Sequence, residues 1–319
     1  MTAVKESVLI SAYIAEMITI PEDLTDFLYW VKERTEAFWN PPIGDPGMHQ
    51  CADWIRGARW KGLSNGEIDA IEIKFDIKFT PEHRLFLSIL HAIDRKEKIE
   101  YTETFDDDAP VLIEERPFFY HWQADDAAIR EALDWPSRTI WEDIIGPNKV
   151  WLRSWGARPA DEPAQKEIFD AWYRSAPLLI PIKGHRFIVS DMRLQTRPVL
   201  SIWGSDTIVY GWDLRGYLLK ELEEHLDINV PVFDEEDQTW YTETITEVKA
   251  ILEEDYRRGA KEDIPYWKEM ILIWSSGWSS FCMNPYEQSG IQPIVKTYAP
   301  EDDSNEQKIF NSYKDNGSE

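Results

Sequence analysis

Residues 198–222, PVLSIWGSDTIVYGWDLRGYLLKEL, hold the local pattern that most restricts the fold of this chain. Two short runs rich in branched and aromatic residues, 199–203 and 207–210, are typical of strands, and the Gly-Ser-Asp sequence between them is typical of a turn. Asp213 then occupies an N-cap position, because leucines follow it at every fourth residue, as on one face of a helix. The segment predicts a strand, a turn, a second strand and a capped helix, in which Gly211 and Asp213 are structural residues.

Two helix-start signals precede this segment. Ser64 and Glu67 have the spacing of a capping box, in which each side chain accepts a hydrogen bond from the other residue's backbone N–H. Thr80 is a capping hydroxyl followed by Pro81 and Glu82, a proline and an acid in the first turn. Apolar residues recur at helical spacing after both signals. The sequence therefore predicts two consecutive amphipathic helices with Ser64, Glu67 and Thr80 as structural residues.

Apolar runs and breaker residues predict further elements. Proline and glycine clusters mark their ends, and spacing separates helices from strands. In chain order we expect a strand within 7–17, a helix from about 24 to the breakers at 40–47, a helix closed by Trp135-Pro136, a helix at 168–176, strands at 177–182 and 185–189, and a helix at 243–258.

The charge balance narrows the classes of partner. Lys and Arg total 34 and Asp and Glu total 59, which gives a formal net charge of -25. Binding to nucleic acid needs clustered cations to neutralise phosphates, so we expect no nucleic-acid partner. A basic protein surface is the natural electrostatic partner, although a large negative charge also serves solubility alone.

Cysteine usage and the length of apolar runs indicate an intracellular protein. Cys51 and Cys282 are far apart and belong to no CxxC pair, so neither a disulfide framework nor a thiol metal site is expected. No secretory leader pattern opens the sequence, and no apolar run approaches the ~18 residues of a membrane span. We expect a cytoplasmic protein without a membrane partner.

Several common motifs of catalytic chemistry do not occur in the sequence. The dinucleotide, P-loop and zincin patterns are all missing. His83 and His91 stand two helical turns apart, too far for a shared metal ion, and His185 beside Arg186 lacks a nucleophile signature. We therefore expect no catalytic residue, no metal and no cofactor.

Four residues beside the predicted crease between strands and helix form the candidate partner-binding patch. Trp203, Asp206, Tyr210 and Trp212 combine aromatic rings with a carboxylate. Aromatic side chains with a polar group are enriched at protein interfaces. As an alternative, Asp206 is only a turn residue, just as Asp213 is a helix cap.

Three segments together resemble the SUKH superfamily, which includes fungal cell-wall regulators and bacterial toxin-immunity proteins. GLSNGEIDAIEIKFDIKFTPEHRLFL at 62–87 is similar to the family's early helix pair. PLLIPIKGHRFI at 177–188 and the segment 198–222 are similar to its late strands, its Ser-Asp turn and its Asp-Leu helix entry. LHAIDRKEKIEY stands here in place of the Asn-Gly-Gly turn that many members have after the second helix.

The resemblance implies an α+β fold, with helices packed against a mixed, mostly antiparallel sheet. It also divides the chain into a SUKH-like domain with additions on both sides. These are an N-terminal helical and strand extension at 1–56, the domain at 57–230, a C-terminal extension packed on the domain at 231–299, and an acidic tail at 300–319, whose polar composition predicts disorder.

Members of this family resemble binding modules rather than enzymes. The resemblance implies a non-enzymatic, cytoplasmic protein-binding module, in the first place an immunity protein that neutralises a polymorphic or contact-dependent toxin. An acidic surface suits basic toxins such as nucleases. The alternative is an intracellular regulator or scaffold of cell-wall synthesis or signalling, and a third hypothesis is a hydrolase or glycan binder that uses the tryptophans and Asp206.

Overall fold

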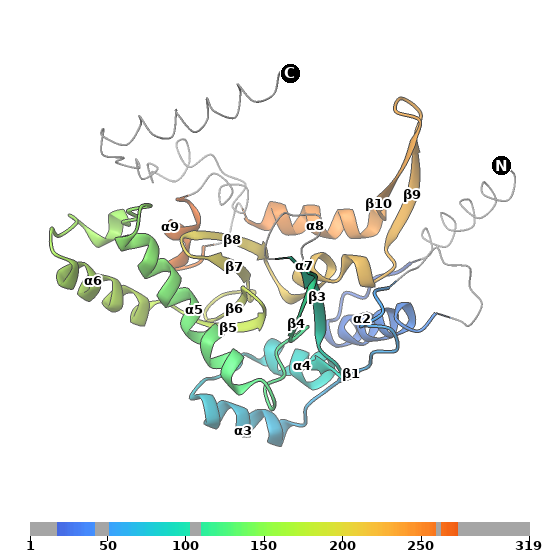
Figure 1. The fold of residues 1–319 in the computed structure, drawn as a ribbon, viewed down its shortest axis with the longest axis horizontal. Helices are drawn as coiled ribbons and strands as arrows, with labels where there is room; N and C mark the ends of the chain where they lie inside the picture. Colours follow the sequence, from blue (N-terminus) through green and yellow to red (C-terminus); the bar gives the residue numbers. More distant parts are fainter. Residues whose placement is uncertain (1–17, 42–50, 103–109, 260–262, 274–319) are drawn as a thin grey trace, which may run out of the picture.

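The computed structural model describes residues 18–41, 51–102, 110–259 and 263–273 of the 319-residue chain. Over these residues it combines helices with small antiparallel sheets (Figure 1). The α+β class predicted from the sequence is therefore confirmed. The strand expected within 7–17 and the tail expected at 300–319 lie outside the described residues.

Helices and strands are interspersed along the described chain. The helices are α2 (Leu24–Phe38), α3 (Asn65–Phe75), α4 (Pro81–Leu90), α5 (Asp126–Ile145), α6 (Glu162–Ser175), α7 (Leu214–Glu221), α8 (Thr246–Gly259) and α9 (Trp267–Ile271), with short 3-10 helices η1 (Arg153–Trp155) and η2 (Glu223–His225). The strands are β1 (Trp60–Lys61), β2 (Ala92–Ile93), β3 (Glu97–Tyr101), β4 (Leu112–Arg116), β5 (Leu178–Lys183), β6 (Arg186–Ser190), β7 (Val199–Trp203), β8 (Asp206–Gly211), β9 (Asn229–Asp234) and β10 (Thr239–Thr244).

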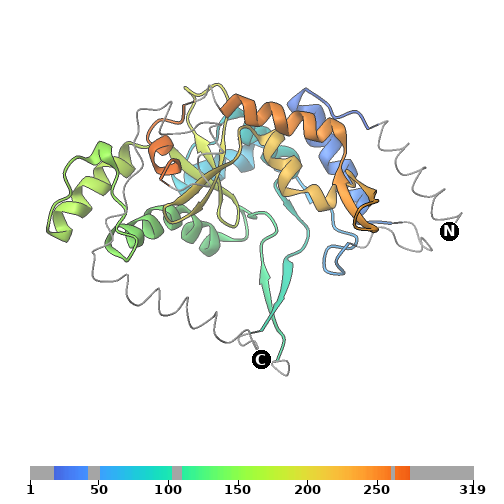
Figure 2. The same ribbon diagram turned by 90° about the horizontal axis from the view of Figure 1, so that it is seen from above.

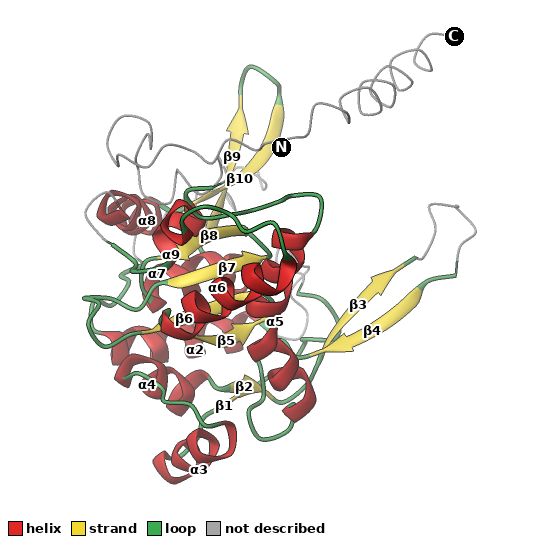
Figure 3. Cartoon of the chain, turned by 90° about the vertical axis from the view of Figure 1, so that its left-hand side faces the viewer, coloured by secondary structure: helices red, strands yellow, loops and turns green. Residues whose placement is uncertain are grey.

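Strands β5 to β8 form a four-stranded antiparallel sheet in sequence order (Figure 3). The two strands predicted around the Gly-Ser-Asp turn are β7 and β8, and their register places Trp203 opposite Asp206. Three further pairs, β1–β2, β3–β4 and β9–β10, form separate two-stranded sheets. Every strand pair among the described residues is antiparallel, so the mixed pairing implied by the resemblance is not found in this part of the chain.

Helices cover both faces of the four-stranded sheet. Alternate residues of a strand point to opposite faces. Accordingly, Leu179 and Ile180 belong to different hydrophobic clusters, and so do Phe187 and Ile188. One cluster joins the sheet to α2, α3, α4 and α7, and the other joins it to α5, α6 and α9 (Figure 1). The sheet is thus the middle layer of the body and is held from both sides.

Elements from both predicted additions pack on this body. Helix α2 buries Phe27, Leu28 and Val31 in the cluster that also contains α4 and α7. Helix α8 contributes Val248 to the same cluster, and its Asp255 accepts a hydrogen bond from the residue after β8. Residues on both sides of the region predicted as a domain therefore share one hydrophobic core with it.

The caps predicted for the helix pair are confirmed. Ser64 Oγ accepts from the N–H of Glu67 at 3.3 Å, and Glu67 Oε2 accepts from the N–H of Ser64 at 2.8 Å. Hydrogen bonds from the backbone and side chain of Ser64 lower the pKa of Glu67 to about 2. Thr80 Oγ1 accepts from the N–H of His83 at 3.3 Å. Both helices therefore begin where the sequence places them.

The junction between β8 and α7 is also built as expected. Asp213 Oδ1 accepts from the N–H of Gly216 at 2.8 Å, which makes Asp213 the cap of α7. Its second oxygen forms an ion pair of 2.7 Å with Arg258 on α8. A Cβ on Gly211 would lie 2.6 Å from the backbone nitrogen of Tyr217, closer than such atoms approach, so the chain needs a glycine there.

Helix α5 departs from the sequence-based prediction, which ends it at Trp135-Pro136. The structure continues the helix through Pro136 to Ile145. An interior proline removes one helical hydrogen bond and costs about 3 kcal/mol. Pro136 is buried, and the turns beyond it bury Ile140 and Ile144 in the cluster with α6 and α9. Packing of this face offsets the cost of the proline.

Two hairpins project from the body, β3–β4 and β9–β10, each as an isolated ribbon (Figure 3), and Figure 2 shows β3–β4 from a second side. The sequence patterns do not predict strands at the positions of β9 and β10, which lie in the predicted C-terminal extension. The helix expected at 243–258 begins later, at Thr246, because Glu243 and Thr244 pair with β9.

Candidate protein-binding site

Trp203 and Trp240 are the exposed tryptophans of the described chain. Fourteen of the sixteen tryptophans lie in the described residues, and all but these two are buried or half-buried. Trp203 is 63% exposed and Trp240 is 50% exposed. A tryptophan ring has a large apolar area that is usually buried. An exposed tryptophan side chain therefore indicates a surface for binding a partner. Trp203 belongs to the predicted patch and lies between two surface hollows, which makes it the centre of the candidate site.

The turn that carries Trp203 is held against α5. Gly204 has a φ of +59°, and a Cβ there would lie 2.3 Å from Asp143 Oδ2, so both backbone and space require glycine. Asp143 Oδ2 accepts from the backbone N–H and from the hydroxyl of Ser205, both at 2.6 Å. These contacts fix the turn between β7 and β8, with Trp203 and Asp206 at its two ends.

Trp203 packs against Trp135 of α5. The two rings are T-shaped with centroids 5.2 Å apart, and Trp135 Nε1 donates to the carbonyl oxygen of Ile202 at 3.1 Å. The imidazole of His185 also packs edge-on against Trp203, at 5.7 Å between centroids. We call Trp135 and Trp203 the tryptophan ridge. The ridge lies between two hollows of about 550 and about 390 Å³, because both residues line each of them.

The larger hollow has a charged floor, formed by Lys183, Arg186 and Glu221. Lys183 Nζ lies 2.8 Å from Glu221 Oε1, and Arg186 Nε lies 3.4 Å from Glu221 Oε2. All three side chains are less than one fifth exposed, at 18%, 17% and 11%. Arg186 also donates to Ser201 Oγ at 2.7 Å, and its guanidinium lies 4.0 Å from the ring centroid of Tyr210. The floor is thus held by ion pairs and ring contacts, and it carries two cations for one carboxylate.

The outer lining of the same hollow is acidic. Glu97 and Arg116 form an ion pair of 2.7 Å, so their opposite charges neutralise each other. Glu114 and Glu131 are exposed, and Glu131 approaches Arg138 only to 3.9 Å. The hollow therefore has a cationic inner end and an anionic opening, and a cation bound from outside is favoured at the opening.

Two ring side chains in the hollow are neutral near pH 7. Burial, assisted by Arg186, lowers the pKa of His185. Burial, assisted by Glu131, raises the pKa of Tyr120 to about 12, and its hydroxyl donates to the carbonyl oxygen of Gly184 at 3.1 Å. Both side chains therefore offer ring surface and hydrogen bonding rather than charge.

The structure brings together two of the four residues of the predicted patch. Trp203 and Asp206 face each other across the β7–β8 turn, and both are exposed. Tyr210 lies half-buried beneath Arg186. Trp212 is 3% exposed and belongs to the cluster with α5, α6 and α9. A covered ring offers no surface to a partner, so the patch is narrowed to Trp203 and Asp206.

Trp135 and Tyr120 are site residues that the sequence pattern does not reveal. Trp135 is 67 residues away from Ile202, whose carbonyl it contacts. Tyr120 bonds to Gly184 across 64 residues. Periodicity and capping signals act over a few residues, so neither contact leaves a local signal. The dipeptide His185-Arg186, which the sequence does single out, lies in the hollow beside them.

His83 on α4 and His91, the C-cap of this helix, are both buried in the protein interior. Burial lowers the pKa of His83 and of His91 to about 3, and His91 Nε2 accepts from the N–H of Trp122 at 2.8 Å. Within the described ranges, no group of three or more His, Cys, Asp or Glu is arranged to hold a metal ion. Over the same ranges, no helix combines the length and the apolar character needed to cross a bilayer.

Comparisons of this chain with models of protein families, with curated proteins and with solved structures returned no match. The resemblance to the SUKH superfamily therefore stays a prediction from three sequence segments. What the structure defines is an α+β protein with a tryptophan ridge between two hollows, in which Trp203 is exposed and Trp135 is half-buried.

Proposed function

We propose that this chain is a non-enzymatic protein-binding module and that a basic protein docks on the tryptophan ridge. The observation that carries the proposal is the 63% exposure of Trp203 on a turn that Asp143 and Trp135 hold in place. Large aromatic side chains beside pockets dominate the binding energy of many protein interfaces. Because the turn is already ordered, docking loses little conformational entropy.

The charges beside the ridge favour a lysine or arginine of the partner. Glu114 and Glu131 supply carboxylates at the opening of the larger hollow, and Trp203 and Tyr120 supply ring surface for a cation. The net charge of -25 accelerates the approach of a basic protein at moderate salt. Both effects select the same class of partner.

Among basic proteins, a toxin such as a nuclease agrees with the resemblance of three segments to the SUKH superfamily. An immunity protein acts by occupying its toxin, which requires a stable interface and no chemistry. A cytoplasmic regulator of cell-wall synthesis would use the same ridge for another partner. The identity of the bound protein therefore separates the two functions.

The test pairs the chain with a toxin encoded beside its gene. Cells that express the toxin receive the wild-type chain, Trp203→Ala or Tyr29→Ala; Tyr29, 50% exposed on α2, is the matched control. We expect the wild type and Tyr29→Ala to restore growth. Trp203→Ala should weaken toxin binding at least about 30-fold in calorimetry, equivalent to about 2 kcal/mol, and restore growth poorly.

Two results would change this proposal. Equal toxin affinity of Trp203→Ala and the wild type would place the docking surface away from the ridge. If no neighbouring toxin is neutralised, but the wild-type chain captures a cell-wall protein that Trp203→Ala does not, regulation replaces immunity.

A further inference from the structure

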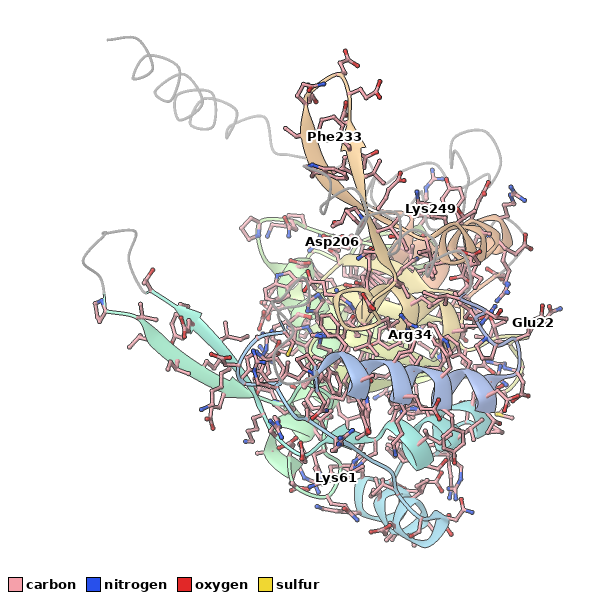
Figure 4. All side chains as sticks on the ribbon, turned by 90° about the vertical axis from the view of Figure 1, so that its right-hand side faces the viewer. Glu22, Arg34, Lys61, Asp206, Phe233 and Lys249 are labelled. Carbon is pink, nitrogen blue, oxygen red and sulfur yellow. The ribbon has the colours of Figure 1, made fainter. Side chains whose placement is uncertain are left out.

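The β9–β10 hairpin projects from the body (Figures 1 and 4), and three of its aromatic side chains are exposed. Phe233, Trp240 and Tyr241 are 38%, 50% and 45% exposed. Figure 4 shows Phe233 on the projecting ribbon and Asp206 on the body, so this surface is separate from the tryptophan ridge. An isolated two-stranded hairpin is marginally stable in water, and exposed aromatic surface on it indicates a binding site.

The hydrogen-bonding pattern of the hairpin follows from one contact at its base. Ile245 donates its N–H to the carbonyl oxygen of Ile228 at 2.9 Å, which makes these residues a hydrogen-bonded pair. Hydrogen-bonded and non-hydrogen-bonded pairs alternate along an antiparallel ribbon. By the observed register, Phe233 and Trp240 form a non-hydrogen-bonded pair, in which side chains lie closest. Their ring centroids are 5.1 Å apart, which agrees with this assignment.

The two outer edges of the hairpin are not equivalent. Pro231 pairs with Thr242, and the same alternation makes this a non-hydrogen-bonded pair, whose N–H and C=O groups point outward. Proline has no N–H, so the β9 edge lacks a donor at this position. The β10 edge presents the outward groups of Trp240 and Thr242, and residues 239–243 are all exposed. In the described part of the chain β10 has β9 as its one neighbouring strand, so its edge is open to another.

The charges of the hairpin specify what kind of segment fits this edge. Residues 229–245 contain no Lys or Arg and five carboxylates: Asp234, Glu235, Glu236, Asp237 and Glu243. Glu243 pairs with Lys249 at 2.8 Å, and Asp234 accepts backbone N–H groups within the turn. The three remaining carboxylates are exposed at the tip and form no ion pair with the described residues. A second copy of the chain would bring the same charges to this edge, and repulsion disfavours that pairing.

We propose that β10 binds an extended, Lys- and Arg-rich segment of another protein as a third strand of this ribbon. The backbone of the segment pairs with the outward groups of Trp240 and Thr242, in the manner of strand addition. Its cationic side chains lie over the rings of Trp240 and Phe233 and close to the acidic tip. Strand addition covers the aromatic face and stabilises the hairpin. The proposal is independent of the tryptophan ridge, since the two surfaces can take different partners.

The first experiment varies the peptide and leaves the protein unaltered. A fluorescein-labelled peptide of alternating arginine and valine is titrated with the full chain, and fluorescence anisotropy gives the Kd. A second peptide has the same side chains but N-methyl groups on the alternate amides that would face β10. A third has glutamate in place of arginine. We expect the second and third peptides to bind at least about tenfold more weakly than the first, because each loses backbone pairing or charge complementarity.

The second experiment varies the protein. Trp240→Ala removes the ring, and Tyr29→Ala removes an equally exposed ring on α2. We expect Trp240→Ala to weaken binding of the arginine peptide about tenfold and Tyr29→Ala to change it less than about twofold. Equal affinities of these two variants would assign the binding to net charge and overturn the proposal. Equal binding of the methylated and unmethylated peptides would overturn strand addition without reliance on the folding of any variant. A dimer detected by sedimentation, and lost in Trp240→Ala, would identify a second copy as the occupant instead.

Discussion

Trp203 and Trp240 are both exposed, but they stand on different supports. Trp203 ends a strand of a four-stranded sheet that is buried on both faces, and its turn is bonded to Asp143. Trp240 stands on a two-stranded ribbon, where its ring partner is Phe233. The first surface is ordered by the core of the protein. The second is tied to the body at its base, by Glu243 with Lys249 and Thr244 with Glu223, and its outer part is ordered by contacts within a single hairpin.

This difference predicts two modes of binding. A surface fixed by the core loses little entropy when it docks, so the tryptophan ridge is suited to a folded partner of complementary shape. A ribbon that is marginal alone gains order when a third strand is added, so the hairpin is suited to an extended segment. Variants that remove support from one region should leave the other unchanged.

The largest expected effect comes from the floor beneath the ridge. Glu221 contacts both Lys183 and Arg186. Glu221→Ala leaves two poorly exposed cations beside each other, and we expect the free energy of unfolding to fall by about 3 kcal/mol in urea titrations. Binding at the ridge should weaken with it, whereas the affinity of the hairpin for the arginine peptide should stay the same.

Glu224 provides the matched control for this change, because it is an exposed glutamate in the adjacent 3-10 helix. Glu224→Ala should alter the free energy of unfolding by less than about 0.5 kcal/mol. Similar values for the two variants would mean that the ion pairs of the floor do not support the ridge.

An intermediate effect is expected from Asp255, which ties α8, the helix after the hairpin, to the end of β8. Asp255 Oδ2 accepts from the N–H of Trp212 at 3.1 Å. Burial, assisted by Asp213, raises the pKa of Asp255 to about 6. The unfolded chain has an Asp pKa of about 3.9, so the native state binds this proton more tightly. The stability that the proton contributes is complete below about pH 4 and is lost as the pH rises through about 6.

The measurement compares the wild type with Asp255→Asn in urea titrations at several pH values. The variant has no proton to lose, so it should gain stability relative to the wild type as the pH rises from about 4 to about 7. We expect a relative gain on the order of 2 kcal/mol. A difference that does not vary with pH would contradict the raised pKa.

The smallest effect on stability is expected at the hairpin. Trp240→Ala removes an exposed ring from a ribbon outside the core, so the free energy of unfolding should change by less than about 0.5 kcal/mol. Local order should fall instead, and amides of residues 229–244 should exchange with solvent faster than in the wild type, as mass spectrometry can measure. A large loss of global stability would show that the hairpin belongs to the cooperative core, and the contrast between the two supports would fail.

The parts of the fold that could be predicted are those with local causes. Ser64 with Glu67, Thr80, and Asp213 each act on a backbone N–H three residues away, so sequence spacing alone identifies them. The strands β7 and β8 are separated by a turn of characteristic residues, and their alternation can be read directly. In the candidate site, Trp203 and Asp206 could be predicted from the sequence because both flank that turn.

The remaining features depend on contacts between distant segments. Trp212 has the same local appearance as an exposed aromatic residue, and its burial results from α5, α6 and α9. The chemistry of proline predicts that a helix ends at Pro136. The helix α5 continues through this residue because its face packs on the sheet. Trp135 reaches the site from a helix 67 residues away from Ile202. No pattern within a few residues encodes these contacts.

Asp213 has a consequence for the divergence of this chain from its relatives. Asn and Ser cap helices about as well as Asp, and Thr caps them slightly less well, so the start of α7 tolerates any of the three. Only Asp also supplies a charge to Arg258, at 2.7 Å on α8. Positions 213 and 258 should therefore covary among homologues, and a relative that has lost one member of the pair should have replaced the other. Covariation of these two positions would therefore identify homologues of this chain. The order strand, turn and helix is too common among proteins to do so.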